Sequence, residues 1–299
     1  MRDNVPDLQT IIYKQMETRF DPEHGALWCF MDPKPRPCFN PGLLDDLQRY
    51  VHSIRMMNRG GTPSKNENRV RYSVIASKNP DVFSFGGDLD LFLGLFQKKD
   101  RDGLRRYART CVDIVYAGTV GVDLSVTTIS LVQGDALGGG FEAALCNNIV
   151  VAERRANFGL PEILFNLFPG MGAFHFLARR MDVARAEKMI LSGRIYGAEE
   201  LHRMGVVDIL AENGEGEKAV SEYIRKNSPR WNAHQSLLKV RNRVRPVSYE
   251  ELVDVADIWV DTVFNLDAKD LRVMGRVLKS QDDLAGGSAV PEDVGQGFA

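Results

Sequence analysis

The chain has 299 residues, of which 44% are apolar and 26% are charged, and its net charge is −2. This composition is typical of a globular protein with one or two domains, and it excludes collagen-like, mucin-like and wholly disordered chains. No basic excess points to nucleic acid, and no apolar run is long enough to cross a membrane. Charges are scattered over the first twenty residues with no apolar signal core, so we expect a cytoplasmic protein.

Strands and helices are expected to alternate through the first 210 residues. Short apolar, β-branched segments predict strands, and apolar residues at helical spacing predict helices. The expected strands are 26–31, 69–77, 126–132, 149–152 and 206–210, and the expected helices are 43–57, 102–117 and 198–204. The polar segment 58–68, rich in glycine and asparagine, is expected to be a loop.

Only helical patterns follow this alternation. Ser248 and Glu251 form an S-x-x-E capping box, and the helix after it is expected to bury Leu252, Ala256, Trp259 and Val263. The last helix is expected to bury Leu271, Met274 and Leu278. This order indicates an α/β fold with a parallel sheet and an appended helical part. We expect a core over 1–215, a helical part over 216–285 and a disordered tail over 286–299.

The cysteines and histidines give no sign of a metal site. The four cysteines lie far apart without a C-x-x-C pair, so we expect free, mostly buried thiols in a reducing compartment; they are Cys29, Cys38, Cys111 and Cys146. The five histidines form no H-E-x-x-H motif. No G-x-S-x-G motif for a serine nucleophile occurs either.

Two glycine-rich segments follow expected strands, FSFGGDLDLF at 83–92 and QGDALGGGFEAAL at 133–145. Glycine has no Cβ, so its backbone N–H can approach a ligand closely. Two such loops can direct two N–H groups at one oxygen, and a helix beginning near Gly139 would add the positive end of its dipole. Such an arrangement is an oxyanion hole, although tight turns alone would also explain either loop.

Two glutamates are candidates for proton transfer. Glu142 lies one turn into the helix expected after Gly139, and Glu162 follows Pro161 in the first turn of another helix. Both have apolar neighbours in the sequence, and a carboxyl group in an apolar pocket has a raised pKa and exchanges protons near neutral pH. They therefore form a candidate acid/base pair, the alternative being that each only complements a helix dipole.

The segment GGGFEA at 138–143 also fits the G-x-G-x-x-A pattern of dinucleotide-binding folds, and Glu162 stands about 20 residues further on. In that fold, however, the acidic residue ends the next strand, whereas Glu162 follows Pro161 at an expected helix start. A single glycine fingerprint is weak evidence. A nicotinamide-dependent oxidoreductase is therefore the less favoured interpretation.

Taken together, these segments resemble the crotonase (enoyl-CoA hydratase/isomerase) superfamily. FSFGGDL matches the family's first oxyanion loop, VQGDALGGGFEAALCNNIVVA its second, FGLPEILFNLFPGMGA the segment with the second acid, and LSGRIYGAEELHRMGVVDIL the next helix and strand. The resemblance covers residues 20–215. It implies a spiral of ββα repeats and a C-terminal helical part that supplies the acyl pocket and the contacts of a homotrimer. It also implies that Gly87 and Gly139 donate the oxyanion N–H groups and that Glu142 and Glu162 are catalytic.

The chain also looks like one bacterial subgroup, the diffusible signal factor synthases. RFDPEHGALWCFM, RPCFNPGLLDDL and IWVDTVFNLDAKDLRVMGRVLKSQ carry this likeness, which spans residues 10–281. Asp90 stands where CoA enzymes often have a basic residue. The likeness implies a 3-hydroxyacyl chain on acyl carrier protein, dehydrated and then hydrolysed to a free cis-2-unsaturated fatty acid for quorum sensing.

The mechanism implied by the resemblance needs no metal and no cofactor. The thioester oxygen would lie between the N–H groups of Gly87 and Gly139, which stabilise first an enolate and then a tetrahedral oxyanion. One glutamate removes the α-proton and the other protonates the departing hydroxyl group. The sequence does not show which glutamate is the base.

Further residues are expected to bind the substrate. Gly86 and Gly138 adjoin the two oxyanion glycines. The apolar candidates for an acyl tunnel are Leu137, Phe168, Met171, Trp259 and Met274. Met171 and Trp259 are preferred, because methionine adapts to a flexible chain and tryptophan supplies a flat wall. Plain core packing is the alternative for each of them.

Two basic stretches are candidates for docking the acidic carrier protein. The first recurs every four residues on an expected helix and consists of Arg101, Arg105 and Arg109. The second consists of Lys239, Arg241, Arg243 and Arg245. The sequence does not choose between these stretches, and a solvated helix face is the alternative for both.

Three functions remain open. The favoured one is a signal synthase with dehydratase and thioesterase activity. The second is an enoyl-CoA hydratase or isomerase of fatty-acid oxidation, and the third is a catalytically idle crotonase-fold protein that binds an acyl chain or a regulatory protein. The presence of both glutamates argues against the third, and the missing CoA-type features argue against the second. We expect no nucleic-acid or membrane partner.

Overall fold

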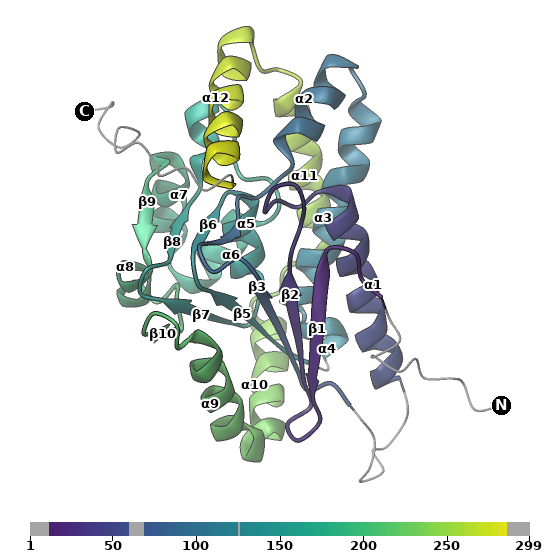
Figure 1. The fold of residues 1–299 in the computed structure, drawn as a ribbon, viewed down its shortest axis with the longest axis vertical. Helices are drawn as coiled ribbons and strands as arrows, with labels where there is room; N and C mark the ends of the chain where they lie inside the picture. Colours follow the sequence, from purple (N-terminus) through teal and green to yellow (C-terminus); the bar gives the residue numbers. More distant parts are fainter. Residues whose placement is uncertain (1–11, 60–68, 125, 286–299) are drawn as a thin grey trace, which may run out of the picture.

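The computed structural model describes residues 12–59, 69–124 and 126–285, and its strands form two sheets (Figure 1). In spatial order, the larger sheet contains β1 (Met16–Asp21), β2 (Ala26–Met31), β3 (Tyr72–Ser77), β5 (Thr127–Val132), β7 (Ile149–Glu153) and β10 (Ile209–Ala211). β1 pairs antiparallel with β2, and every following pair is parallel. The central strands are almost fully buried, as is usual where both faces of a parallel sheet are covered.

The smaller sheet contains, in order, β4 (Val82–Ser84), β6 (Asp135–Leu137), β8 (Asn157–Gly159) and β9 (Ile195–Gly197). Its first three strands are parallel, and β9 is antiparallel to β8. Along the chain, β4 follows β3, β6 follows β5 and β8 follows β7, and a helix follows each pair. This repetition confirms the expected α/β fold, a spiral of ββα repeats with a C-terminal helical part.

Several helices of the repeats begin where the sequence supplies a side-chain cap or a proline. They are α1 (Pro41–Asn58), α2 (Leu89–Gln97), α3 (Arg101–Thr119), α4 (Gly121–Leu124), α5 (Gly139–Leu145), the 3₁₀-helix η2 (Pro161–Phe165), α6 (Ala173–Arg180), α7 (Val183–Ser192) and α8 (Ala198–Arg203). Asn40, Asp88 and Asp100 each accept a backbone N–H at the start of α1, α2 and α3. Pro161 occupies the first turn of η2.

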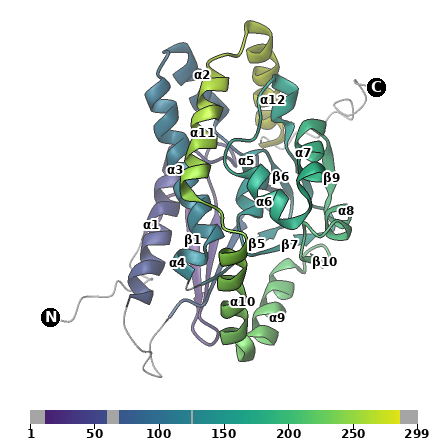
Figure 2. The same ribbon diagram turned by 180° about the vertical axis from the view of Figure 1, so that it is seen from behind.

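The C-terminal helices cover two different parts of the molecule. They are α9 (Gly216–Asn227), the 3₁₀-helix η3 (Ser228–Arg230), α10 (Trp231–Val244), α11 (Tyr249–Val263) and α12 (Ala268–Ala285). Val220 and Ile224 of α9 pack on the larger sheet in a cluster with Trp28. By contrast, α11 lies along α3, and α12 contacts α2 and η2 (Figure 2). None of the helices in the described ranges has the length and apolar character needed to span a membrane.

The expected strand at 206–210 begins three residues later, at Ile209. The N–H groups of Val206 and Val207 both donate to the carbonyl of Leu201, so these valines form the turn after α8. Gly205, with φ +78°, ends α8 as expected. Val206 and Val207 are apolar and β-branched, yet they form a turn, because their N–H groups bond to the end of α8 and not to a neighbouring strand. The loop was expected over 58–68; Asn58 is the last residue of α1, and residues 60–68 lie outside the described residues, as does the expected tail at 286–299.

Half of the expected capping box is present. The hydroxyl of Ser248 accepts the N–H of Glu251 at 3.2 Å, which caps α11. The Glu251 carboxylate, however, lies 3.8 Å from His175. The carboxylate of Glu250 accepts from the Ser248 hydroxyl instead, at 2.8 Å. The four expected residues on the buried face of α11 are buried.

Candidate active site

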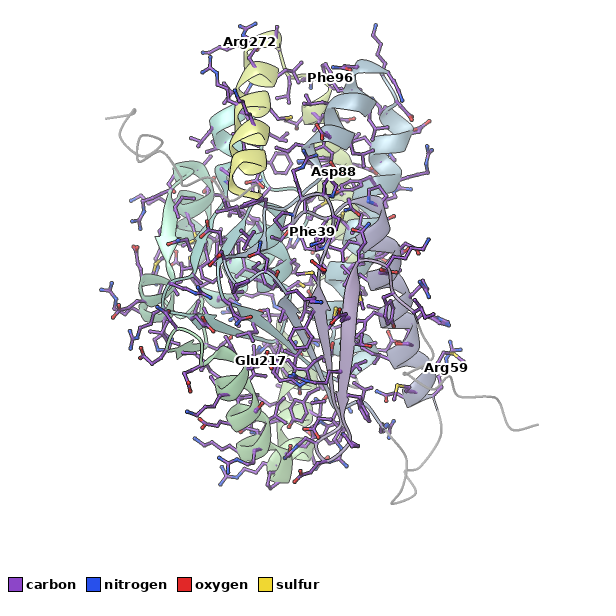
Figure 3. All side chains as sticks on the ribbon, in the orientation of Figure 1. Phe39, Arg59, Asp88, Phe96, Glu217 and Arg272 are labelled. Carbon is purple, nitrogen blue, oxygen red and sulfur yellow. The ribbon has the colours of Figure 1, made fainter. Side chains whose placement is uncertain are left out.

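A cavity of about 90 Å³ lies where the two glycine-rich segments, 83–92 and 133–145, meet the surrounding helices. Its wall comes from α1, α2, α3, α5, η2, α11 and α12 and from the segments that join them. Figure 3 labels Phe39, which lines the cavity, and Asp88, which follows the first glycine loop; both lie in the half of the molecule that contains α2 and α12. The wall is mostly apolar, and its two carboxyl groups are Glu142 and Glu162.

The two glycine loops touch each other at this cavity. Gly86 has φ +91°, and a Cβ built on it would lie 2.6 Å from the backbone nitrogen of Gly139. A Cβ built on Gly139 would lie 3.4 Å from the nitrogen of Gly87. The first loop is fixed from its other side, because the Phe39 N–H donates to the Gly86 carbonyl at 2.8 Å. Gly87 and Gly139 therefore both line the cavity with adjoining backbones.

Glu142 lies in the first turn of α5, and its side chain is buried. Its Oε1 accepts the backbone N–H groups of Met171 at 2.8 Å and of Ala173 at 3.0 Å. Burial raises the pKa of Glu142 to about 7, although the two N–H groups favour the ionised form. This carboxyl group is thus held rigidly and is poised to exchange a proton near neutral pH.

Glu162 lies in η2, and its Oε2 is buried without a hydrogen-bond partner among the described residues. Burial, followed by the charge of Glu142, raises the pKa of Glu162 to about 8. A Cβ on Gly138 would lie 2.7 Å from Glu162 Oε1, so this glycine, with φ +53°, leaves the space that the carboxyl group occupies. The two carboxyl groups thus share one cavity and have different surroundings.

Other expected residues fall on both sides of the cavity wall. Met171 and Trp259 line it, and Trp259 approaches closely because Gly170 has no side chain: a Cβ there would lie 2.4 Å from the indole. Gly138 also lines the cavity. Gly86 lies at the contact between the loops, and its carbonyl holds Phe39. In the described structure, Leu137, Phe168 and Met274 lie outside this wall.

The sequence reasoning did not identify the part of the wall that comes from α1 to α3. Tyr107 and Cys111 of α3 line the cavity, together with Phe39 and Leu44. The hydroxyl of Tyr107 donates to the Phe39 carbonyl at 2.7 Å and accepts the Asp88 N–H at 3.3 Å, so it joins the first glycine loop to the Phe39 segment that packs beside it. Helical periodicity shows that this face of α3 is buried, but it does not distinguish a cavity wall from the core.

The first basic stretch is already paired with acidic residues of α11. Arg101 bonds to Asp261. Asp257 accepts from Arg105 at 2.9 Å and from Arg109 at 3.2 Å. These contacts assign the stretch to the packing of α11 on α3. It is therefore the weaker of the two candidates for docking a carrier protein.

Comparison of the sequence with known proteins identifies the family of the chain. Residues 30–245 match the family model described as enoyl-CoA hydratase/isomerase. The chain belongs to this family. The sequence is 29% identical over 192 residues to an enoyl-CoA isomerase/hydratase of Zymoseptoria tritici, covering 63% of this chain and 58% of that protein. It is 30% identical over 167 residues to the mitochondrial methylglutaconyl-CoA hydratase of Rattus norvegicus, covering 56% of this chain and 51% of that protein.

The fold of the family extends over most of the chain. The enoyl-CoA hydratase of Bacillus halodurans superposes with a TM-score of 0.70 at 20% identity, covering 88% of this chain and 100% of that structure. At this identity the likeness shows the fold alone. The curated relatives are matched over only about half to three fifths of their own lengths. They support the crotonase superfamily, whereas closeness to the signal factor synthases is not shown by them.

Proposed function

We propose that this chain adds water across the α,β double bond of an enoyl thioester, or removes it from the 3-hydroxyacyl thioester. The observation that carries the proposal is the pair of buried carboxyl groups, Glu142 and Glu162, in one cavity with both glycine loops. Hydration needs one group that takes a proton from water and one that gives a proton to the α-carbon. An isomerase that moves a single proton needs only one such group, so the pair favours a hydratase.

The surroundings of the two carboxyl groups support a division of roles. In the hydration direction, Glu142 is the base, because two backbone N–H groups stabilise its ionised form. Glu162 is the acid, because its pKa of about 8, raised by burial and by Glu142, keeps it protonated at neutral pH. Glu142 takes a proton from water as the hydroxyl adds to the β-carbon, and Glu162 gives its proton to the α-carbon. Dehydration runs through the same groups in reverse.

The glycine loops support the remaining role. The thioester oxygen becomes negative when the enolate forms, and the N–H groups of Gly87 and Gly139 are the proposed donors to it. Each such donor contributes roughly 3 kcal/mol to the transition state on precedent. Glycine at these positions lets the two backbones approach closely, with Gly86 in a conformation that other residues rarely adopt.

The relatives favour this function over the signal-synthase interpretation, since their names describe CoA hydratases and isomerases. The signal-synthase interpretation adds two more specific proposals, an acyl carrier protein as the carrier of the substrate and hydrolysis of the product to a free acid. One observation supports it: Asp90, beside the first glycine loop, is paired with Arg36. The Asp90 carboxylate neutralises the charge of Arg36, which leaves this cation less able to bind a phosphate group of CoA. A homotrimer and a cytoplasmic location stay predictions.

The test uses the purified chain and Glu142→Gln, Glu162→Gln and Glu217→Gln variants. Glu217 is a control, because it pairs with Arg19 on the surface. We expect hydration of enoyl-CoA esters by the wild type, and a loss of at least about 100-fold in kcat for each of the first two variants. The control should keep the wild-type rate. Folded Glu162→Gln protein with wild-type turnover would contradict the proposal.

The same preparations distinguish the carriers. A 3-hydroxyacyl chain on acyl carrier protein and on CoA are compared by kcat/KM, and free fatty acid is measured by mass spectrometry. A preference for the carrier protein with release of free acid would support the signal synthase. Equal kinetics without release of acid would leave a CoA hydratase.

A further inference from the structure

A second pocket, which we call the arginine pocket, has a volume of about 370 Å³ and lies at the C-terminal end of α5. Four arginines line it: Arg179 and Arg180 from α6, Arg241 from the last turn of α10, and Arg245, which follows α10 directly. The carboxyl group in its wall is that of Asp208. Figure 2 shows α10 on the far side of α6 from α11 and α12. The glutamate pair lines the other cavity, so the two sites are separate.

The positive charge of this pocket is not balanced by the described part of the chain. The charge of Arg180 is paired, because Arg180 bonds to Asp208 and to the carbonyls of Asn147 and Val206. Arg179 donates to the amide of Asn242 at 3.1 Å, and in the described residues no carboxylate lies within ion-pair distance of Arg179, Arg241 or Arg245. The first basic stretch, by contrast, is paired along its length with α11.

Like charges in a half-buried site destabilise the folded chain unless a counter-charge is supplied. Arg179 shows this effect: burial first, then the charges of Arg241, Arg180 and Arg245, lower its pKa to about 10. Asn147 and Asn148 add polar groups to the wall of the pocket. The pocket therefore has forked cationic donors whose charge the carboxylates of the described residues do not balance.

We propose that the arginine pocket binds a phosphorylated small molecule. Guanidinium groups pair with phosphate oxygens through two parallel hydrogen bonds, and several of them together suit a group with more than one negative charge. The volume of about 370 Å³ exceeds what a single phosphate fills and lies in the range of small-molecule sites.

The arginine pocket lies at the C-terminal end of α5, the helix that carries Glu142. α5 carries Glu142 in its first turn, and the residues that follow its last turn, Cys146 to Asn148, line the arginine pocket. The Glu142 carbonyl accepts the N–H of Cys146 at 3.0 Å. A phosphate group bound there would therefore lie at the opposite end of the helix that holds the Glu142 carboxyl group. This inference is independent of the proposed hydratase activity.

The test titrates pyrophosphate into the purified full chain by isothermal calorimetry, with sodium chloride holding the ionic strength constant. We expect saturable binding by the wild type. Arg179→Gln and Arg245→Gln should each weaken it at least about tenfold, as expected for the loss of a charge-assisted hydrogen bond. Arg243→Gln is the matched control, because it removes the same charge from α10 at a residue outside the pocket wall; its affinity should stay within about twofold of the wild type.

Arg245 is exposed, so its variant folds even if the half-buried Arg179 proves necessary for stability. Absence of saturable binding, or equal weakening by all three substitutions, would overturn the proposal. Analytical ultracentrifugation of the same proteins supplies the other decisive outcome. If Arg245→Gln changes the oligomeric state and leaves the pyrophosphate affinity unchanged, the pocket is a contact between copies of the chain, and the proposal is wrong.

Discussion

At the scale of single residues, the two glutamates differ in how the fold treats them. Glu142 is fixed by two backbone N–H groups, whereas one oxygen of Glu162 is buried with no partner among the described residues. A buried carboxyl group without a hydrogen bond is costly when it is ionised. The structure therefore carries a destabilising group at the site where the proposed function needs a proton donor, as is common in active sites.

This cost predicts a pH-dependent effect on stability. The pKa of Glu162, raised by burial to about 8, is higher than that of an unfolded glutamate, so the folded state binds the proton more tightly. The resulting stabilisation is complete below the unfolded pKa and is lost as the pH rises through the folded pKa. The wild type loses this stabilisation as the pH rises, whereas Glu162→Gln has no proton to lose. As the pH rises from about 5 to about 9, the free energy of unfolding of Glu162→Gln should therefore increase by roughly 2–4 kcal/mol relative to that of the wild type.

Urea unfolding at both pH values measures this difference. Glu250→Gln is the control, because backbone and Ser248 contacts lower the pKa of Glu250 and removing that carboxyl group should bring no gain at the higher pH. If the free energies of unfolding of Glu162→Gln and the wild type differ by the same amount at both pH values, Glu162 is solvated in the folded protein and the prediction is wrong.

The sequence was sufficient to identify the glutamate pair but not its surroundings. Apolar neighbours and expected helix starts placed Glu142 and Glu162 in apolar environments, and the structure buries both. Their hydrogen bonds could not be predicted, because the donors to Glu142 are main-chain groups of Met171 and Ala173, about 30 residues away. Almost every residue type has a backbone N–H group, so the identity of a residue does not show that its backbone is a donor.

At the scale of elements, the contact between the two glycine loops determines the site. A Cβ on Gly86 would lie 2.6 Å from the Gly139 nitrogen, whereas Gly214 has a similar positive φ with open space around it. Gly86→Ala should therefore reduce kcat by at least about 100-fold, the scale of losing one oxyanion donor. Gly214→Ala carries the same backbone strain without crowding and should leave kcat unchanged.

Steady-state kinetics on an enoyl thioester, with circular dichroism to verify folding, measure this pair of variants. Similar activity of both proteins would show that the close approach of the loops is not needed. In that event the oxyanion hole would have to be sought elsewhere in the cavity.

The short strands explain why element boundaries were only partly predictable. β4, β6, β8 and β9 have three residues each. Periodicity needs more residues than that to separate a strand from a turn, so the smaller sheet was not expected as such. Long elements such as α1 and α3 were predicted to within two residues, because several turns of apolar spacing define them.

At the scale of the whole molecule, the C-terminal helices are built into the core. α9 covers the larger sheet, α11 lies along α3, and Trp259 closes the cavity against Gly170. We therefore expect residues 12–285 to unfold as one cooperative unit, although the sequence suggested a boundary at 215/216. Trp259→Ala should destabilise this unit by about 3–5 kcal/mol, the usual range for a buried tryptophan.

Differential scanning calorimetry at several protein concentrations checks this expectation. One transition, with equal calorimetric and van't Hoff enthalpies, should move to lower temperature as a whole in the variant. Two transitions, of which Trp259→Ala shifts only one, would show that the helical part folds as a separate domain.

The bonds from the main chain to Glu142 also bear on how such a protein can change over evolutionary time. Every residue except proline has a backbone N–H, so positions 171 and 173 can exchange side chains without releasing the carboxyl group that they hold. Met171 at the same time forms part of the cavity wall. Mutation at this position can reshape the space offered to an acyl chain while the acid/base group stays in place, so new substrates need not be acquired at the expense of the chemistry.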